Sequence, residues 1–229
     1  MSTAPMKAIL FGATGMIGQG VLRECLLDPE IESALAVGRR QTGAHHAKLR
    51  DVVLPDLSDL SSIEADFAGL DACFYCLGVS SAGMKEEDYR RVTYDFTLAA
   101  ANALARESPG ARFLYISGTG TDSTERGRTM WARVKGATEN ALLQMPGLEA
   151  YMFRPGYIQP VHGERSSTKW TRVGYALFAP LYPVWKALFP NYVTTTEELA
   201  RAMLRVAKHG GGKRILEARD FQKVARTSP

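Results

Sequence analysis

The chain has 229 residues, of which 45% are hydrophobic and 23% charged, an ordinary composition for a water-soluble globular protein. This length suits one large domain whose core needs no disulfide or metal for stability. The net charge of +4 comes without a dense run of lysine and arginine, so the composition gives no indication of nucleic-acid binding. An odd total of three cysteines argues against a disulfide framework.

Two segments bear on where the protein works. Residues 1–6 lack the apolar stretch and the small-residue cleavage site of a secretion signal. Residues 173–189 are apolar and aromatic, but Pro180, Pro183 and Lys186 interrupt them, so we do not expect a membrane span there. From these features we expect a cytoplasmic protein.

Strand-like and helix-like segments alternate along the first two thirds of the chain. Apolar runs predict strands at residues 7–11, 31–37, 52–54, 72–76, 112–117 and 149–153. Helical spacing predicts helices at 16–27, 61–67, 86–106 and 128–143, with Ser61 or Ser62 as the cap of the second. Such alternation with short connections predicts the doubly wound α/β class, a parallel sheet with helices on both faces.

After residue 154 this alternation is interrupted. Residues 155–192 contain several prolines and many aromatic residues without a clear period. We interpret them as a small C-terminal substrate or lid region over the edge of the sheet. The whole chain, 1–229, is therefore expected to form a single domain that carries this insertion.

The alternation then resumes. Thr194 or Thr195, each with a glutamate three residues later, predicts a capping box for a helix that ends near Ala207. A last strand is expected at 214–216, and residues 221–224 are interpreted as a frayed end.

A glycine-rich turn directly follows the first predicted strand and precedes the first predicted helix. The first glycine allows a tight turn, the second lets the backbone approach a pyrophosphate, and the third lets the helix pack on the strand. The N–H groups at the start of the helix attract phosphate. In this context the turn predicts a dinucleotide-binding site. The residues expected to contact the cofactor here are Gly12, Thr14, Gly15, Met16, Ile17 and Gly18.

The end of the second predicted strand indicates which dinucleotide is bound. A fold that prefers NAD places an acidic residue there, which binds the ribose 2′-hydroxyl. This chain instead has Val37, Gly38, Arg39 and Arg40. Two guanidinium groups suit a 2′-phosphate, so we expect the cofactor to be NADP(H). The alternative interpretation is that both arginines are solvated loop residues.

These residues resemble the short-chain dehydrogenase/reductase superfamily, in particular its extended and atypical branches with NAD(P)-dependent epimerases and dehydratases. The closest likeness is to the Tat-interacting-protein-like group of small NADPH-binding members. The resemblance is good over residues 7–156 and implies a Rossmann fold. It also implies further cofactor contacts: Asp56 and Leu57 with the adenine, Cys76, Leu77 and Gly78 with the adenine ribose, and Pro155 and Gly156 with the nicotinamide.

The resemblance further implies that Ser117 is a catalytic serine and that Lys135 binds the nicotinamide ribose and lowers the pKa of a catalytic tyrosine. The family has that tyrosine four residues before the lysine, where this chain has Trp131. An indole N–H can orient a carbonyl, but it cannot act as the general acid. Losing a general acid costs on the order of 10²–10⁴ in rate. Tyr157, Lys135, or a water relay through Ser117 or Thr119 are the candidate replacements.

Two classes of function stay open. The first is an NADPH-dependent oxidoreductase that reduces a carbonyl or quinone-type acceptor with a non-standard proton donor. The second is a catalytically weak NADPH-binding sensor or regulatory protein that acts through partners. A nucleotide-sugar epimerase or dehydratase fits less well, because its usual mechanism depends on the missing tyrosine. The substrate is expected to be a small molecule that the sequence does not name, no metal site is expected, and helix pairing as in the family suggests a homodimer.

Overall fold

A computed structural model describes residues 5–164 and 192–226 of the chain. Seven parallel strands form one sheet in the order β3-β2-β1-β4-β5-β6-β9, as the doubly wound class requires. The strands are β1 (Met6–Phe11), β2 (Ile31–Gly38), β3 (Leu49–Val53), β4 (Ala72–Tyr75), β5 (Arg112–Ile116), β6 (Glu149–Arg154) and β9 (Ile215–Glu217). The predicted fold class is therefore confirmed.

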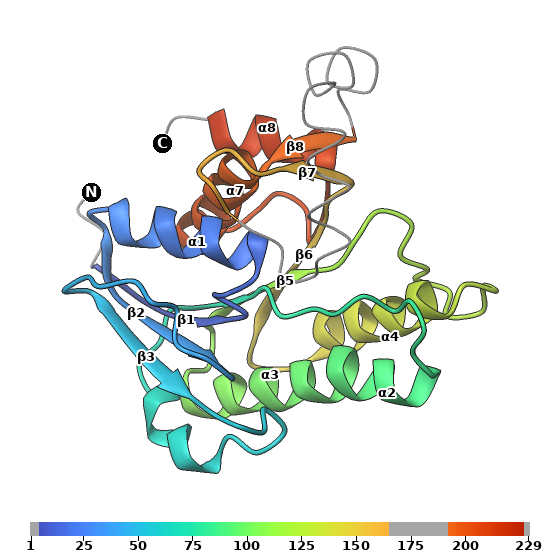
Figure 1. Ribbon diagram of the computed structural model, residues 1–229, viewed down its shortest axis with the longest axis horizontal. Helices are drawn as coiled ribbons and strands as arrows, with labels where there is room; N and C mark the ends of the chain where they lie inside the picture. Colours follow the sequence, from blue (N-terminus) through green and yellow to red (C-terminus); the bar gives the residue numbers. More distant parts are fainter. Residues whose placement is uncertain (1–4, 165–191, 227–229) are drawn as a thin grey trace.

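Helices cover both faces of this sheet (Figure 1). One layer contains α1 (Met16–Leu27), α7 (Thr196–His209) and α8 (Ala218–Arg226). The other layer contains η1 (Ser61–Phe67), α2 (Glu86–Arg90), η2 (Arg91–Asp95), α3 (Phe96–Glu107) and α4 (Met130–Gln144). Two short strands, β7 (Tyr157–Gln159) and β8 (Val193–Thr195), pair in parallel as a separate small sheet.

The central strands are apolar on both sides because successive side chains point into opposite helix layers. Leu10 and Phe74 lie in the layer of α1 and α7, whereas Phe11 and Tyr75 lie in the layer of α3. The rings of Phe11 and Tyr75 are 5.4 Å apart, and those of Tyr75 and Phe113 are 5.6 Å apart. Each buried ring contributes roughly 2–3 kcal/mol. The core therefore fixes the strands whose ends carry the candidate site.

The predicted capping box is present at the start of α7. The Thr195 hydroxyl accepts a hydrogen bond from the Glu198 N–H at 3.0 Å, and the Glu198 carboxylate accepts one from the Thr195 N–H at 3.3 Å. Thr195 is thus the cap, and the helix continues to His209, beyond the predicted end. Gly210, at a φ of 73°, allows the chain to turn away there.

Several predicted elements differ from the observed ones. β3 begins at Leu49, earlier than the predicted 52–54, because it extends its pairing along β2. The predicted helix 86–106 contains one π-helical turn, η2, between α2 and α3. The helix at 61–67 is a 3₁₀-helix whose N-cap is Leu60 without a side-chain hydrogen bond, so the predicted serine caps are wrong.

The C-terminal end is not frayed as predicted but forms the helix α8. Its first turn is held by Asp220, whose carboxylate accepts a hydrogen bond from the Glu217 N–H at 3.0 Å. Phe221 is fully buried, with its ring 5.7 Å from that of Phe153 on β6. This packing supplies the stabilisation that a short helix lacks by itself.

The region predicted to be a lid lies largely outside the described residues, since 165–191 are not among them. Its role and the single-domain prediction that includes it stay predictions. Within the described part of the chain, every helix is too short or too polar to cross a membrane.

Candidate dinucleotide site

The glycine turn that follows β1 is tightly built. Gly12 has a φ of 79°, and a Cβ on it would lie 2.6 Å from the Leu77 nitrogen. A Cβ on Gly18 would lie 2.1 Å from the Gly12 carbonyl oxygen, and one on Gly15 would lie 3.3 Å from it. Larger residues would therefore force this turn open. The geometry explains why positions 12 and 18 are glycine, whereas a Cβ at Gly15 would require a shift of only a few tenths of an ångström.

The N-terminus of α1 opens at this turn. Gly15 is its N-cap, no side chain of the described residues caps it, and its first turn contains no acidic residue. The Gln19 side-chain amide donates to the Thr14 carbonyl oxygen at 2.9 Å, which holds the turn closed over the helix start. Uncapped helical N–H groups and the helix dipole together attract an anion.

The loop after β4 lies against the glycine turn. The Cys76 N–H donates to the Phe11 carbonyl oxygen at 2.9 Å, so the two strand ends remain paired up to the turn. The half-buried Cys76 thiol has its pKa raised by burial to about 12, which keeps it protonated. A Cβ at Gly78 would meet open space. β1 and β4 flank the point where the strand order reverses, and ligands of doubly wound sheets bind at this point.

The end of β2 presents the two arginines to solvent. Arg39 and Arg40 are exposed, and neither makes an ion pair within the described residues. Arg40 and Thr14 both line a small hollow between the glycine turn and β2, together with Thr42 and Asp51. Asp51 is already engaged, because it accepts hydrogen bonds from the Thr42 hydroxyl at 2.7 Å and from its N–H. Arg40 thus borders the turn, and neither arginine has an acidic ion-pair partner within the described residues.

Asp56 and Leu57 differ in their exposure. Asp56 is exposed, and its carboxylate accepts hydrogen bonds from the Ser58 N–H at 2.9 Å and the Ser58 hydroxyl at 2.7 Å, which lower its pKa. Leu57 is only 3% exposed and packs in the core layer of α3. The structure therefore leaves the Leu57 side chain little surface for the predicted adenine contact.

Ser117 directly follows β5 and is nearly buried. Its hydroxyl oxygen lies 2.7 Å from that of Thr121, and the Thr121 hydroxyl also donates to the Gly118 carbonyl oxygen at 2.7 Å. Since Thr121 has only one hydroxyl proton, Ser117 is the donor of the pair. Sequence reasoning missed Thr121, whose only signal was its position in the loop after a strand.

Lys135 on α4 reaches the same strand end. Its ammonium group donates to the carbonyl oxygens of Ile116 at 3.2 Å and Ser117 at 3.3 Å, and it lies 5.3 Å from the centroid of the Tyr115 ring. Burial lowers the pKa of Lys135 to about 8, and the carboxylate of Glu139 opposes this shift. The lysine is therefore placed at the carboxyl end of β5, beside Ser117.

Trp131 lies one helical turn before Lys135 on α4. Its indole packs over the loop after β5, where a Cβ on Gly120 would lie 3.5 Å from the ring. Gly120 has a φ of 89°, a conformation that favours glycine. The structure thus brings Ser117, Lys135 and Trp131 to one strand end, while their catalytic roles stay predictions.

The turn after β6 joins this group from the other side. The Thr119 N–H donates to the Pro155 carbonyl oxygen at 2.9 Å, which links the two strand ends. A Cβ on Gly156 would lie 2.5 Å from the carbonyl oxygen of Tyr192, so the residue that precedes β8 approaches closely there. The Tyr157 hydroxyl donates to the Gln159 side-chain oxygen at 2.9 Å. Its proton is therefore engaged within β7.

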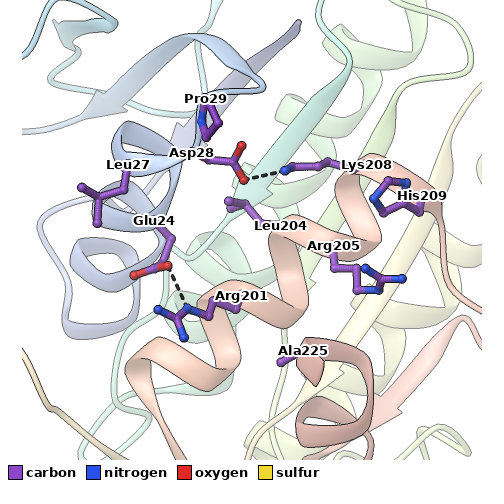
Figure 2. A pocket seen from close by; sticks show the side chains of 10 residues that line it. All are labelled: Glu24, Leu27, Asp28, Pro29, Arg201, Leu204, Arg205, Lys208, His209 and Ala225. Atoms are coloured by element: carbon purple, nitrogen blue, oxygen red, sulfur yellow. Dashed lines mark hydrogen bonds and ion pairs between the residues drawn. The ribbon is translucent and has the colours of Figure 1, made fainter. Parts of the chain in front are cut away.

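A second hollow lies at the far end of α1, between that helix and α7 (Figure 2). Ion pairs cross it: Lys208 lies 2.5 Å from Asp28, and Arg201 lies 3.1 Å from Glu24. The twelve residues of α1 span about 18 Å, so this groove is well separated from the glycine turn. We interpret it as a charged contact that fastens α7 to α1.

The fold and the glycine turn define the Rossmann class of proteins. The model of the NAD dependent epimerase/dehydratase family matches residues 8–126, which is more than half of the chain. The chain belongs to this family, and the resemblance to the superfamily drawn from its sequence is confirmed.

Named relatives extend over almost the whole chain. Protein HTATIP2 of Rattus norvegicus is 25% identical over 228 residues, which cover 97% of this chain and 90% of the relative. Protein FMP52, mitochondrial, of Saccharomyces cerevisiae is 26% identical, covering 91% of this chain and 90% of the relative. Because this relative is named mitochondrial, the expected cytoplasmic location stays a prediction.

Solved structures agree on the fold. The Bordetella bronchiseptica enzyme WbmF, in complex with NAD⁺, superposes with a TM-score of 0.66 at 14% identity, covering 96% of this chain and 77% of that enzyme. At this identity the likeness concerns the fold alone.

Proposed function

We propose that the protein binds NADPH at the glycine turn and is an oxidoreductase that reduces a carbonyl or quinone-type acceptor. The observation that carries this proposal is the uncapped N-terminus of α1, which opens at the same carboxyl edge of the sheet as Ser117 and Lys135. An anion-attracting helix end beside such a pair suits a dinucleotide whose reactive ring lies at the pair. The family supports a nicotinamide cofactor.

NADPH is proposed over NADH because of Arg39 and Arg40. Both side chains are exposed and lack an acidic ion-pair partner within the described residues, and Arg40 lines the hollow beside the glycine turn. A 2′-phosphate would supply the missing anion, and charge-assisted hydrogen bonds to it are worth roughly 1.5–3 kcal/mol each.

The cofactor-side residues proposed are those of the glycine turn, the loop after β4 and the turn after β6. When bound, the cofactor supplies the hydride. Lys135 would hold its ribose, and a pKa of about 8 places this lysine close enough to neutrality to deliver a proton. Trp131 would orient the acceptor at the end of β5, and Ser117 would join it only when its hydroxyl proton turns away from Thr121. Tyr157 is the less direct donor, because its hydroxyl proton is bound to Gln159.

A second candidate function is an NADPH sensor with little turnover. The observation that favours it is Trp131 at the position of the family tyrosine, packed against Gly120 with no titratable hydroxyl. Such a protein would bind the cofactor through the same turn and act through a partner. Turnover distinguishes the two functions.

The test measures NADPH consumption by the full chain with a panel of quinones, aldehydes and ketones. An oxidoreductase shows steady turnover with at least one acceptor, and Lys135→Met removes it. Trp131→Tyr restores a general acid and is expected to raise the rate on the order of 10²-fold. Trp131→Phe is the matched control, since it changes the ring without adding a hydroxyl. Tight NADPH binding without turnover in either the wild type or Trp131→Tyr would favour the sensor.

A further inference from the structure

A fully buried carboxylate lies directly behind the candidate site. Glu139 on α4 has no exposed surface, and its oxygens accept hydrogen bonds from the Arg154 Nε at 3.0 and 3.2 Å and from its Nη2. Arg154, the last residue of β6, also donates to the Ser123 hydroxyl at 2.6 Å and lies 3.5 Å from Glu217 of β9. The ion pair thus joins α4, the loop after β5, β6 and β9.

Stability alone is a weak explanation for this pair. Burying two charges costs several kcal/mol per ion, and apolar replacement of a buried pair is often neutral or stabilising. Glu139 follows Lys135 by four residues on α4, which places both side chains on one face of the helix. Arg154 directly precedes Pro155 and Gly156, the turn proposed to border the nicotinamide. The pair therefore connects the helix of the lysine to that turn.

The charges around Lys135 single out Glu139. Two tyrosines lie nearby, Tyr115 of β5 under the ammonium group and Tyr89 of α2 next to Tyr115. Burial raises the pKa of both phenols, so they are neutral near pH 8. The Glu139 carboxylate raises the pKa of Lys135 against the effect of burial. Arg154 neutralises part of that carboxylate, and Glu217 neutralises part of Arg154.

We propose that Glu139, bound to Arg154, is a positioning residue for Lys135 that fixes α4 to the turn after β6 and keeps the lysine ammonium charged at neutral pH. The inference rests on the proposed function only where it assigns Lys135 to the cofactor. The electrostatic link itself belongs to the protein without a ligand.

The test follows the ionisation of Lys135 by NMR of the lysine side chains in the cofactor-free protein, with the signal assigned by its loss in Lys135→Met. Glu139→Gln keeps the shape of the side chain and removes its charge. It is expected to lower the pKa of Lys135 by about one pH unit. The double variant Glu139→Leu/Arg154→Met removes both charges of the pair and is the better-tolerated replacement. It is expected to lower the pKa of Lys135 by less than Glu139→Gln does. Glu86→Gln is the matched control, because Glu86 also pairs with an arginine of α4, Arg133.

A purely structural role predicts a different result. The variants would then lose stability while the pKa of Lys135 stayed at the wild-type value, and this outcome overturns the proposal. The same conclusion follows if Glu86→Gln shifts the pKa as much as Glu139→Gln. Because the measurement uses no cofactor, it separates failure of this proposal from failure of NADPH to bind. If Glu139→Gln does not fold, the double variant decides by itself, because an unchanged pKa of Lys135 in that variant contradicts the proposal.

Discussion

At the scale of single residues, Lys135 is the group whose surroundings most constrain the chemistry. Its ammonium group is held by two main-chain carbonyls and the face of Tyr115, and burial lowers its pKa from 10.5 to about 8. The folded protein therefore releases this proton at a lower pH than the unfolded chain does. Burial of the charged form of Lys135 therefore destabilises the folded protein relative to the unfolded chain.

This linkage gives a prediction for stability against pH. Between pH 8 and 10.5 the unfolded chain binds the Lys135 proton more strongly than the folded protein, so stability rises with pH in that window. Relative to Lys135→Met, the wild type is expected to gain about 2 kcal/mol in free energy of unfolding between pH 7 and pH 10. Urea unfolding of both proteins across this range measures the difference. If the free energies of unfolding of the wild type and Lys135→Met changed with pH in parallel, this would contradict the lowered pKa of the buried Lys135.

The residues of the candidate site were predictable to different degrees. Ser117, Lys135 and Trp131 were implied by the resemblance to the family, and the structure brings them to one strand end. Thr121 and Glu139 were not predicted, because the first acts through one hydroxyl contact in a loop and the second through pairing with a distant strand. Such partners depend on tertiary packing, which single-sequence spacing does not reveal.

At the scale of elements, the β1–α1 unit is the part on which the cofactor proposal depends. Gly18 lets the first turn of α1 touch the Gly12 carbonyl, and the helix start remains uncapped by side chains of the described residues. The tight turn and the free helix end are two consequences of the same glycines.

Gly18→Ala is expected to disrupt this unit. Its Cβ would lie 2.1 Å from the Gly12 oxygen, a clash with backbone that the turn relieves only by opening. We expect a loss of about 1–3 kcal/mol in the free energy of unfolding, together with loss of NADPH binding. Gly212→Ala is the control, because a Cβ there meets nothing within 4 Å. If both variants had the free energy of unfolding and the NADPH affinity of the wild type, the close packing of this turn would be refuted.

The elements themselves were predicted where their pattern is local. The apolar runs of the central strands and the capping box of α7 are signals within a few residues, and both were confirmed. α8 and the β7–β8 pair were missed because they depend on contacts with distant segments, Phe221 with Phe153 and β7 with a strand more than thirty residues later. The π-helical turn η2 has no simple sequence signature.

At the scale of the whole molecule, strand–helix alternation was sufficient to predict the doubly wound sheet, because parallel strands require crossover helices. The strand order then places the glycine turn, Ser117 and the turn after β6 along one edge. The acceptor and the predicted homodimer depend on surfaces whose shape no local pattern encodes. The interpretation of 155–192 as a lid therefore stays a prediction.

The central claim is that the glycine turn binds NADPH, and equilibrium titration of the full chain with NADPH and with NADH, followed by cofactor fluorescence, tests it most directly. We predict at least about tenfold tighter binding of NADPH, with the preference lost in Arg39→Ala or Arg40→Ala. Arg219→Ala, which removes the same charge from an exposed position on α8, is expected to keep the preference. Binding of neither cofactor would contradict the claim, and equal binding of both would contradict the role of the two arginines.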